Sequence, residues 1–274
     1  MNNYEHRYEQ FTFRSYVNYF ADPDPLDFDH EHDASGDGIS DADTYWLSSD
    51  PLIDGRAHPL RKDVFVEVDW MEGVDRLSDE AKWRIGTRFY ENDIWLHIDD
   101  GKMGGGGEVP YISTIYNNHD NEALTLDGYR DAYFTPEREG LFRYGLMADY
   151  VYHDDPGWPL NVDEWFPWDL FEGRNVLGFA SPGRFVVSQK TNLVPFHTTN
   201  PGTVFMHELG HTVGLWSSVY DGIDSWRSHS DYPSIMNYKT LLQDSDFYDY
   251  SDGTNSDVDH DDWGHIRGNL HEGI

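Results

Sequence analysis

Residues 205–225 read FMHELGHTVGLWSSVYDGIDS and open with two histidines four residues apart, with a glutamate between them. On a helix this spacing places His207 and His211 on one face, where both imidazoles can bind a single zinc ion. Glu208 lies one step round the same helix, within reach of a water molecule on that ion. The alternative is a helix that merely carries two surface histidines. Gly214, three residues after His211, and a second motif downstream argue against that alternative.

The second motif is SIMNY, at residues 234–238. With it, the sequence resembles the metzincin zinc peptidases, whose motif H-E-x-x-H-x-x-G-x-x-[HD] is followed by a methionine turn beneath the metal. The matching residues are His207, Glu208, His211 and Gly214 in the first part and Met236 in the turn. The resemblance implies a zinc-dependent endopeptidase in which Glu208 acts as general base and then as general acid.

The resemblance also covers residues outside these two motifs. In astacin-like and serralysin-like metzincins the tyrosine two residues after the methionine lies near the zinc, which implies that Tyr238 stabilises the oxyanion of the tetrahedral intermediate. Other segments look, in the same order, like a broad group of microbial metzincin-like proteins: DVFVEVDWM (63–71), IWLHIDDGKMGGGG (94–107) and GLFRYGLM (140–147). The resemblance thus spans roughly residues 60–240 and implies a protein or peptide substrate.

The third metal ligand departs from the metzincin pattern. That pattern expects His or Asp six residues after the second histidine, and Ser217 stands there. A neutral hydroxyl is a poor zinc ligand compared with an imidazole or a carboxylate. Either the connection is longer and a later residue binds, or the site holds zinc weakly or not at all.

Three later residues can complete the site, and we rank them Asp224, then Asp221, then His229. Asp224 comes first because Gly222 permits a sharp bend before it and Ile223 can anchor the connection in the core. A solvated aspartate is the alternative interpretation for both acidic candidates. A thermolysin-like site is disfavoured because its third ligand is a glutamate, and after Glu208 the chain has only Glu272.

The order of predicted elements gives the expected fold. Strands are expected at residues 63–70, 94–99 and 183–189, and helices at 78–90, 140–153, 203–215 and 257–270. Strands that alternate with helices predict an α+β fold with a twisted, mostly parallel sheet, flanking helices and an active-site helix, as the metzincin resemblance also implies. Residues 1–60 form an acidic, loop-rich segment, and residues 61–274 form the catalytic domain, with an N-lobe to about 215 and a small irregular C-lobe over 216–274.

The last expected helix follows a dense cluster of Asp and His that includes His260 and His265. A second cation site is one interpretation of this cluster. The interpretation that we prefer is a capped helix, in which Asp257 to Asp262 lie near the positive end and Trp263, Ile266 and Leu270 pack inward.

The charge of the chain is unusual. The 274 residues carry 51 acidic and 19 basic side chains, a formal net charge of -32, and Asp outnumbers Glu by 36 to 15. So much like charge opposes compaction in ordinary buffer, whereas concentrated salt screens it. We therefore favour a protein of an extreme halophile over an acidic protein with calcium sites. The same charge disfavours a nucleic-acid partner, because phosphates would be repelled.

The segment DASGDGISDADT, residues 33–44, resembles a calcium-binding loop in its spacing. The oxygen ligands expected at positions 1, 3, 5, 7 and 9 are Asp33, Ser35, Asp37, the carbonyl of Ile39, and Asp41. Gly38 at position 6 allows the tight turn. Position 12 is Thr44 rather than a bidentate Glu, although Asp43 beside it can substitute. The alternative is a solvated acidic loop without a cation.

Several classes of protein are excluded or disfavoured. The chain has no cysteine, so it has neither disulfides nor thiolate ligands, and a metal must bind to His, Asp or Glu. We find no transmembrane segment and no signal peptide, so we expect an extracellular location if the chain is processed and otherwise the cytoplasm of a high-salt cell. The rival to the peptidase is a non-catalytic, calcium-stabilised binding or surface protein with a degenerate zinc site.

Overall fold

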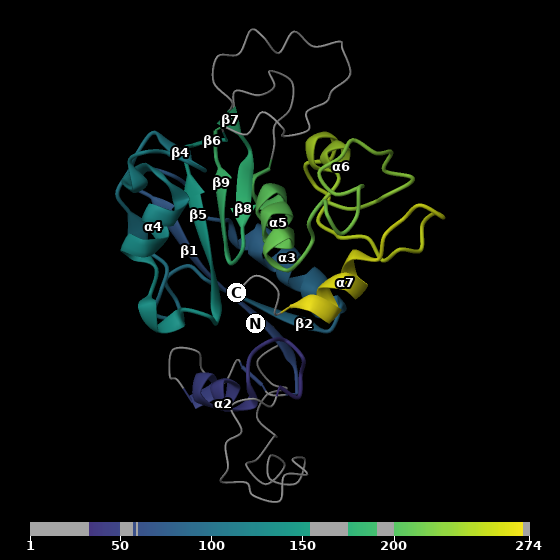
Figure 1. Cartoon of the computed structure of the whole chain (residues 1–274), viewed down its shortest axis with the longest axis horizontal. Helices are drawn as coiled ribbons and strands as arrows, with labels where there is room; N and C mark the ends of the chain where they lie inside the picture. Colours follow the sequence, from purple (N-terminus) through teal and green to yellow (C-terminus); the bar gives the residue numbers. More distant parts are fainter. Residues whose placement is uncertain (1–32, 50–56, 59, 154–174, 191–199, 271–274) are drawn as a thin grey trace, which may run out of the picture.

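The computed structural model of the chain describes residues 33–49, 57–58, 60–153, 175–190 and 200–270 (Figure 1). The strands of its main sheet lie in the order β2 (Ile94–Asp99), β1 (Lys62–Met71), β5 (Phe142–Ala148), β9 (Arg184–Ser188) and β8 (Gly178–Ser181). Neighbouring strands are parallel except for β8 and β9, which are antiparallel. A short β3 (Glu108–Val109) pairs with the end of β1. The expected mostly parallel sheet is confirmed.

Helices cover both faces of this sheet (Figure 1). On one face lie α3 (Asp79–Glu91) and α5 (Pro201–Thr212), and on the other lies α4 (Leu126–Tyr133). Beyond α5 are α6 (Tyr238–Gln243) and α7 (Asp262–Asn269). The remaining elements are α2 (Asp41–Ser49), the 3-10 turns Glu122–Leu124 and Pro136–Arg138, and a second sheet of β4 (Thr114–Tyr116), β6 (Tyr150–Tyr152) and β7 (Asn175–Val176). No described helix has both the length and the hydropathy needed to cross a bilayer.

The alternation in β1 divides the interior into two cores. Val64, Val66 and Val68 belong to the main core, which also contains buried residues of α3 and α5. Phe65 and Met71 belong to the second core, which contains buried residues of α4 and β5. Because both faces of the sheet are covered, β1 is buried along almost its whole length.

Three expected helices are present, with corrected ends. In α3 the Ser78 side chain accepts a hydrogen bond from Ala81 N at 3.1 Å, as expected of its cap. The helix predicted at 203–215 is α5, which starts after the Asn200 cap and ends at Thr212 because the chain turns at Gly214 with φ of 101°. The helix predicted at 257–270 begins only at Asp262.

The helix predicted at 140–153 is wrong, because this segment forms β5 and β6. All seven residues of β5 are buried, since the strand lies between β1 and β9 with helices on both faces. A strand covered on both faces reads as a continuous apolar run rather than an alternating one. The apolar spacing therefore did not distinguish it from a buried helix.

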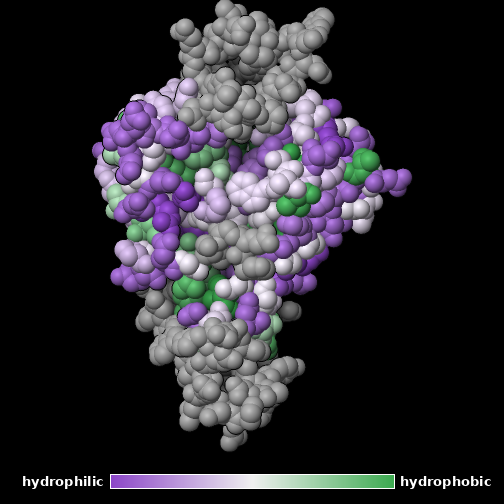
Figure 2. Space-filling model, in the orientation of Figure 1, coloured by the Kyte–Doolittle hydropathy of each residue, from purple (hydrophilic) through white to green (hydrophobic). Residues whose placement is uncertain are grey.

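The described part of the acidic amino-terminal segment packs against the sheet. Ile39 and Ala57 belong to the second core. The Asp37 carboxylate accepts a hydrogen bond from the backbone N of Asp63, at 2.7 Å, just inside the start of β1. On the face shown in Figure 2, hydrophilic side chains cover most of the described surface around α4 and the carboxyl-terminal helices, whereas hydrophobic side chains form small separate groups.

A buried arginine connects β5 to the ends of two helices. Arg143 is 1% exposed and donates to the carbonyl oxygens of Thr212 at 2.9 Å and Leu270 at 2.7 Å. These residues end α5 and cap α7, where the partial negative charges of the helices favour a cation. Burial lowers the pKa of Arg143 to about 10, which still leaves it charged at neutral pH. Arg143 thus fixes the end of α5 next to His211.

We expect Arg143→Met to destabilise the protein by about 2–4 kcal/mol, because two buried carbonyl groups lose their donor. Arg184→Met is the control, since the ion pair of Arg184 with Asp127 is partly exposed, and its loss should cost less than about 1 kcal/mol. Urea unfolding followed by circular dichroism measures both variants. An equal loss of unfolding free energy in the two variants would contradict the role of Arg143 in holding the ends of α5 and α7.

Candidate metal centre

Helix α5 carries the two motif histidines through the interior of the protein. The Asn200 side chain caps it by accepting from Gly202 N at 2.9 Å, and Pro201 occupies the first turn, where its missing N–H is not needed. All residues from Gly202 to Thr212 are buried, because the helix lies between the sheet and the carboxyl-terminal segment. His207 and His211 are 1% and 6% exposed.

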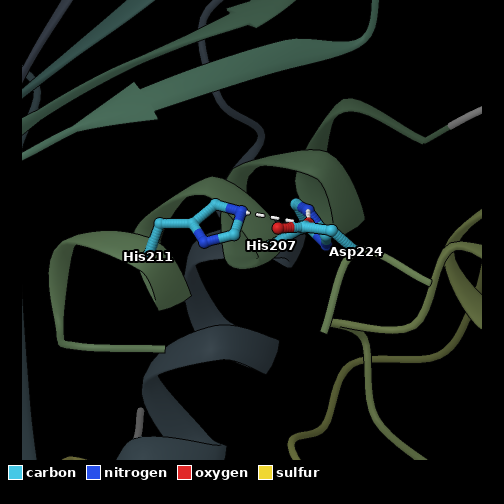
Figure 3. A group of neighbouring side chains, drawn as sticks. All are labelled: His207, His211 and Asp224. Atoms are coloured by element: carbon cyan, nitrogen blue, oxygen red, sulfur yellow. Dashed lines mark ion pairs between the residues drawn. The ribbon is translucent and has the colours of Figure 1, made fainter. Parts of the chain in front are cut away.

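The structure brings His207, His211 and Asp224 together (Figure 3). The Nε2 atoms of both histidines lie 3.3 Å from Asp224 Oδ1. Zinc binds nitrogen and oxygen ligands at about 2.0–2.1 Å, so neighbouring ligands of a tetrahedral ion lie about 3.3–3.4 Å apart. The distances from Asp224 Oδ1 to both Nε2 atoms therefore match the spacing of neighbouring ligands on a tetrahedral zinc ion, and the ligand atoms of all three side chains lie within 4.8 Å of one another.

The Asp224 oxygen between the imidazoles supports this fit. Asp224 Oδ1 is buried and makes no hydrogen bond, although both Nε2 atoms lie at ion-pair distance. Buried polar atoms are rarely left without a partner, and a cation at this point would supply one. Burial opposes ionisation of Asp224, but His211 and His207 outweigh it and hold the pKa of its carboxyl well below the usual range. Burial also lowers the pKa of His211, and Asp224 reverses this and raises it overall.

The other ring nitrogens of the histidines bind backbone carbonyls. His207 Nδ1 lies 2.9 Å from Ile235 O, and His211 Nδ1 lies 2.6 Å from Leu215 O. A carbonyl oxygen can only accept, so in the neutral rings each Nδ1 carries the hydrogen and each Nε2 presents its lone pair. Both imidazoles are thus fixed in the tautomer that a metal requires.

An aromatic side chain stacks on each imidazole. Tyr238 stacks on His207 with ring centroids 5.5 Å apart, and Trp216 stacks on His211 at 4.9 Å. The two imidazole planes are almost perpendicular, at 87°. Sequence analysis predicted that Tyr238 lies at the site but missed Trp216. An aromatic residue five positions after a histidine does not by itself predict that the two rings stack.

Asp224 reaches the histidines because the connection after α5 bends at this residue. Its φ is 56°, a left-handed conformation that Asp tolerates better than most side chains, and its backbone N donates to Met236 O at 3.0 Å. Ile223 beside it is 1% exposed and belongs to the main core. The expected anchor at Ile223 is therefore present. Gly222 lies within a turn that the hydrogen bond from Ile223 N to Tyr220 O closes at 3.1 Å, and the left-handed residue Asp224 follows that turn.

The other candidates for the third ligand have different partners. Asp221 is exposed and forms an ion pair with Arg227 at 2.7 Å. His229 Nδ1 lies 3.1 Å from Thr240 Oγ1, and its ring packs edge-on against Phe247. Ser217 is exposed. Of the residues considered from the sequence, the structure thus brings only Asp224 to the two histidines.

Met236 lies against the helix that carries the histidines. It is fully buried, and a methyl group added at Gly210 would lie 2.5 Å from its sulfur. The glycine between the two histidines therefore makes room for the methionine of the SIMNY segment. This close contact sets the distance between the SIMNY segment and α5.

Glu208 lies beside the histidines and against the edge strand β8. It is 4% exposed, and burial raises the pKa of its carboxyl to about 8, with His207 opposing this effect and Asp224 adding to it. A methyl group at Gly178 would lie 2.7 Å from Glu208 Oε1 and 2.5 Å from the Val186 carbonyl oxygen. A glycine in β8 is thus what leaves space for this carboxylate, and sequence analysis missed it.

The proposed calcium loop folds around its own carboxylates. Asp33 accepts hydrogen bonds from the backbone N of Gly36 at 2.7 Å and of Gly38 at 2.8 Å. Asp43, the expected substitute at position 12, instead accepts from Ser40 Oγ at the start of α2. Within the described residues, three His, Asp or Glu side chains come close enough to share a metal only at His207, His211 and Asp224. Calcium binding in residues 33–44 stays a prediction.

Comparison with protein-family models and with curated proteins gives no match to this chain. Among solved structures, the chain is similar to a zinc-dependent peptidase from Methanocorpusculum labreanum (strain Z). The TM-score is 0.34 and the sequence identity 13%, over 63% of this chain and 87% of that chain. A likeness this distant carries no conclusion about the present site, which rests on its own geometry.

We expect zinc to stabilise the wild-type protein, by about 2.7 kcal/mol at a free zinc concentration 100 times the dissociation constant, because the ion binds only the folded site. Asp224→Ala should lose this stabilisation, whereas Asp221→Ala should retain it, since Asp221 pairs with Arg227 instead. Thermal unfolding with zinc and with a chelator measures the effect. A zinc-dependent rise in Tm that survives in Asp224→Ala would exclude Asp224 as a ligand.

Proposed function

We propose that this protein is a zinc-dependent endopeptidase of the metzincin type, with zinc held by His207, His211 and Asp224. The observation that carries this proposal is the convergence of two imidazole Nε2 atoms on a buried Asp224 oxygen that makes no hydrogen bond. Three protein ligands leave the fourth tetrahedral position for water or substrate, as in catalytic zinc sites. When bound, zinc lowers the pKa of a water molecule and polarises the peptide carbonyl.

Glu208 is proposed to move the proton. It follows His207 directly in the sequence and lies buried beside Gly178, the first residue of β8, so its carboxylate is shielded from bulk water. Burial favours its protonated form, and a divalent cation nearby favours the carboxylate, so the two effects bring its pKa toward neutrality. A group poised in this range can accept a proton from the attacking water and then donate it to the leaving amine.

Tyr238 is proposed to stabilise the oxyanion. Its ring is held on His207, and burial, with the neighbouring Asp224 and Glu208, raises its pKa well above the usual value. The phenol therefore keeps its hydrogen at neutral pH and can donate it to a developing negative charge. A donor held in a buried site stabilises such a charge more than it would in water.

The edge strand β8 suggests how an extended peptide binds. Among the described residues β8 pairs only with β9, so its other edge is not part of the sheet. An extended peptide can add to such an edge through main-chain hydrogen bonds. Gly178 in β8 lies against Glu208, so a peptide bound along this edge would pass the proposed base. This arrangement favours cleavage within a chain.

Glu208→Gln should lower kcat/KM on an unfolded casein-like substrate by about 10²–10⁴, because the amide cannot accept the proton. Zinc content should stay near one per chain, since Glu208 is not a proposed ligand. Metal analysis and cleavage assays in high salt measure both quantities. Cleavage that survives this substitution, or wild-type protein without zinc, would favour the non-catalytic alternative.

Tyr238→Phe should lower kcat by about 10²-fold while KM changes little, because the hydroxyl is proposed to stabilise the charge that develops in the transition state. The Phe ring can keep the stacking on His207, so zinc affinity should be retained. Tyr248→Phe is the matched control, as Tyr248 is another buried tyrosine of the main core. A fall in zinc affinity parallel to the fall in kcat would show that the hydroxyl instead supports the metal ligands.

A further inference from the structure

The SIMNY segment holds two of the three proposed ligands through its backbone. Ile235 O binds His207 Nδ1 at 2.9 Å, and Met236 O accepts from the backbone N of Asp224 at 3.0 Å. These two carbonyl groups are consecutive in the chain, while His207 and Asp224 come from α5 and from the connection after it. The position of residues 235–236 therefore sets the orientation of one imidazole and the place of the carboxylate.

Ser234 connects this segment to the carboxylate of Asp262 on α7. Its hydroxyl accepts a hydrogen bond from the backbone N of Met236 at 3.1 Å and donates to Asp262 Oδ2 at 2.6 Å. Ser234 and Asp262 are both fully buried. The turn at Met236 is thus closed by a serine that is itself held by Asp262.

Asp262 gathers donors from several segments of the carboxyl-terminal region. Tyr232 donates to it, with its hydroxyl 2.9 Å and 2.8 Å from the two carboxylate oxygens. Ser251 N lies 3.2 Å from Oδ2, and His260 Nδ1 lies 2.8 Å from Oδ1. Hydrogen bonds to an ionised acceptor are shorter and stronger than those between neutral groups, so this carboxylate fixes its donors firmly.

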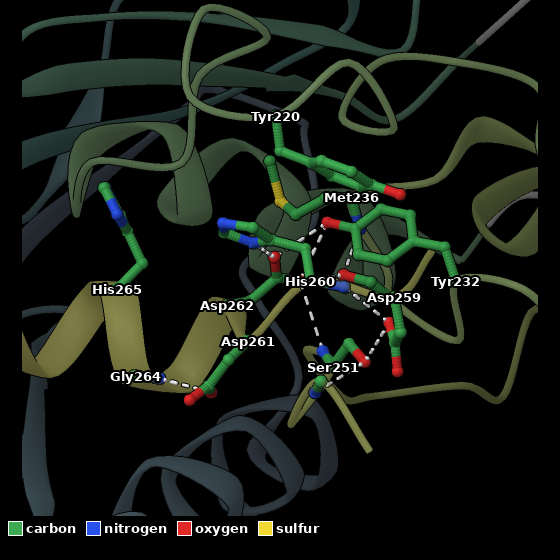
Figure 4. A network of polar contacts seen from close by, with 12 residues as sticks. Tyr220, Tyr232, Met236, Ser251, Asp259, His260, Asp261, Asp262, Gly264 and His265 are labelled. Carbon is green, nitrogen blue, oxygen red and sulfur yellow. Dashed lines mark hydrogen bonds and ion pairs between the residues drawn. The ribbon is translucent and has the colours of Figure 1, made fainter. Parts of the chain in front are cut away.

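The neighbouring aspartate has the role expected of a charged residue at a helix start. Asp261 caps α7 by accepting from the backbone N of Gly264 at 2.6 Å, whereas Asp262 points away into the network of Figure 4. Sequence analysis placed both residues near the positive, amino-terminal end of the helix. Because Asp261 already caps the helix, burial of a second carboxylate beside it needs another explanation.

We propose that Asp262 is a positioning residue for the metal centre, a role that rests on the proposed zinc site. Its carboxylate holds Ser234 and Tyr232, Ser234 closes the turn, and the turn presents the carbonyls of Ile235 and Met236 to His207 and Asp224. Residues that orient metal ligands in this way typically change metal affinity or activity by 10- to 100-fold when they are mutated.

The test measures zinc affinity, by competition with a chromophoric chelator, on protein shown to be folded by circular dichroism. Asp262→Asn keeps the shape but turns one acceptor into a donor that faces other donors. We expect it to weaken zinc binding by about 10- to 100-fold. Ser234→Ala removes both hydrogen bonds of the hydroxyl, to Met236 N and to Asp262 Oδ2, and should weaken binding in the same direction. The double variant should lose less binding free energy than the two single variants lose together, because both substitutions break the same connection from Asp262 through Ser234 to Met236.

Two controls separate positioning from a loss of stability. Asp259→Asn changes a neighbouring carboxylate that binds Ser251 Oγ at 2.7 Å, and Asp259 makes no recorded contact with residues 234–236 among those described. Ile266→Val loosens the packing of α7 without removing a polar contact. Both controls should bind zinc as the wild type does, even where their Tm falls.

The outcomes distinguish this inference from the proposed function. If wild-type protein binds zinc and folded Asp262→Asn and Ser234→Ala bind it equally tightly, the positioning role is wrong and the zinc site stands. If Ile266→Val weakens binding as much as Asp262→Asn at a matched loss of Tm, the effect is one of stability and the role is again wrong. Wild-type protein that binds no zinc overturns both proposals.

Discussion

The Asp224 carboxylate lies between two imidazoles in the interior, with one oxygen that makes no hydrogen bond. An ionised group in this position is costly unless an opposite charge is close, and the neighbouring histidines already hold its pKa low. A divalent cation bound here would remove that cost and satisfy both Nε2 atoms at once. The surrounding contacts serve this arrangement, because carbonyls orient the imidazoles, aromatic rings stack on them, and a glycine in β8 leaves space for Glu208.

Neutral donors hold many of the buried acids in this chain. With 51 acidic and 19 basic residues, most carboxylates cannot find a Lys or Arg. Asp99 accepts hydrogen bonds from four backbone amides of residues 101–105 in addition to its ion pair with Arg138. Asp262 is held by hydroxyls, a backbone amide and a histidine. Backbone amides and hydroxyls are neutral donors, so they can bind buried carboxylates without any basic side chain. Buried carboxylates can therefore position loops even in a protein with so few Lys and Arg residues.

The parts of the site that sequence analysis predicted are those set by local geometry. The spacing of His207 and His211 fixes their shared face once the helix forms. Ile223 is a single apolar residue between polar neighbours, and this local pattern predicted that it would be buried next to Asp224. Gly178 and Asp262 could not be found in this way, because their roles arise from contacts with residues 30 and 28 positions away, Glu208 and Ser234. Tertiary contacts that the local sequence does not show also explain why a helix was wrongly predicted at 140–153. Both faces of β5 are buried there, so the strand lacks the alternation of apolar and polar residues that identifies a strand.

The connection between α5 and Asp224 shows how a longer loop can bring a carboxylate to the two histidines. Asp224 follows His211 by 13 residues rather than the 6 of the metzincin pattern, a difference of 7. Doubling the length of a flexible loop costs only about 0.6 kcal/mol in closure entropy. Burial of one large aliphatic side chain contributes about 1.5–3 kcal/mol, and Ile223 is 1% exposed. Trp216, stacked on His211, fixes the start of the same connection. Anchors at both ends thus outweigh the added entropy of loop closure, so the position of Asp224 depends on the residues that flank the loop rather than on the length of the loop.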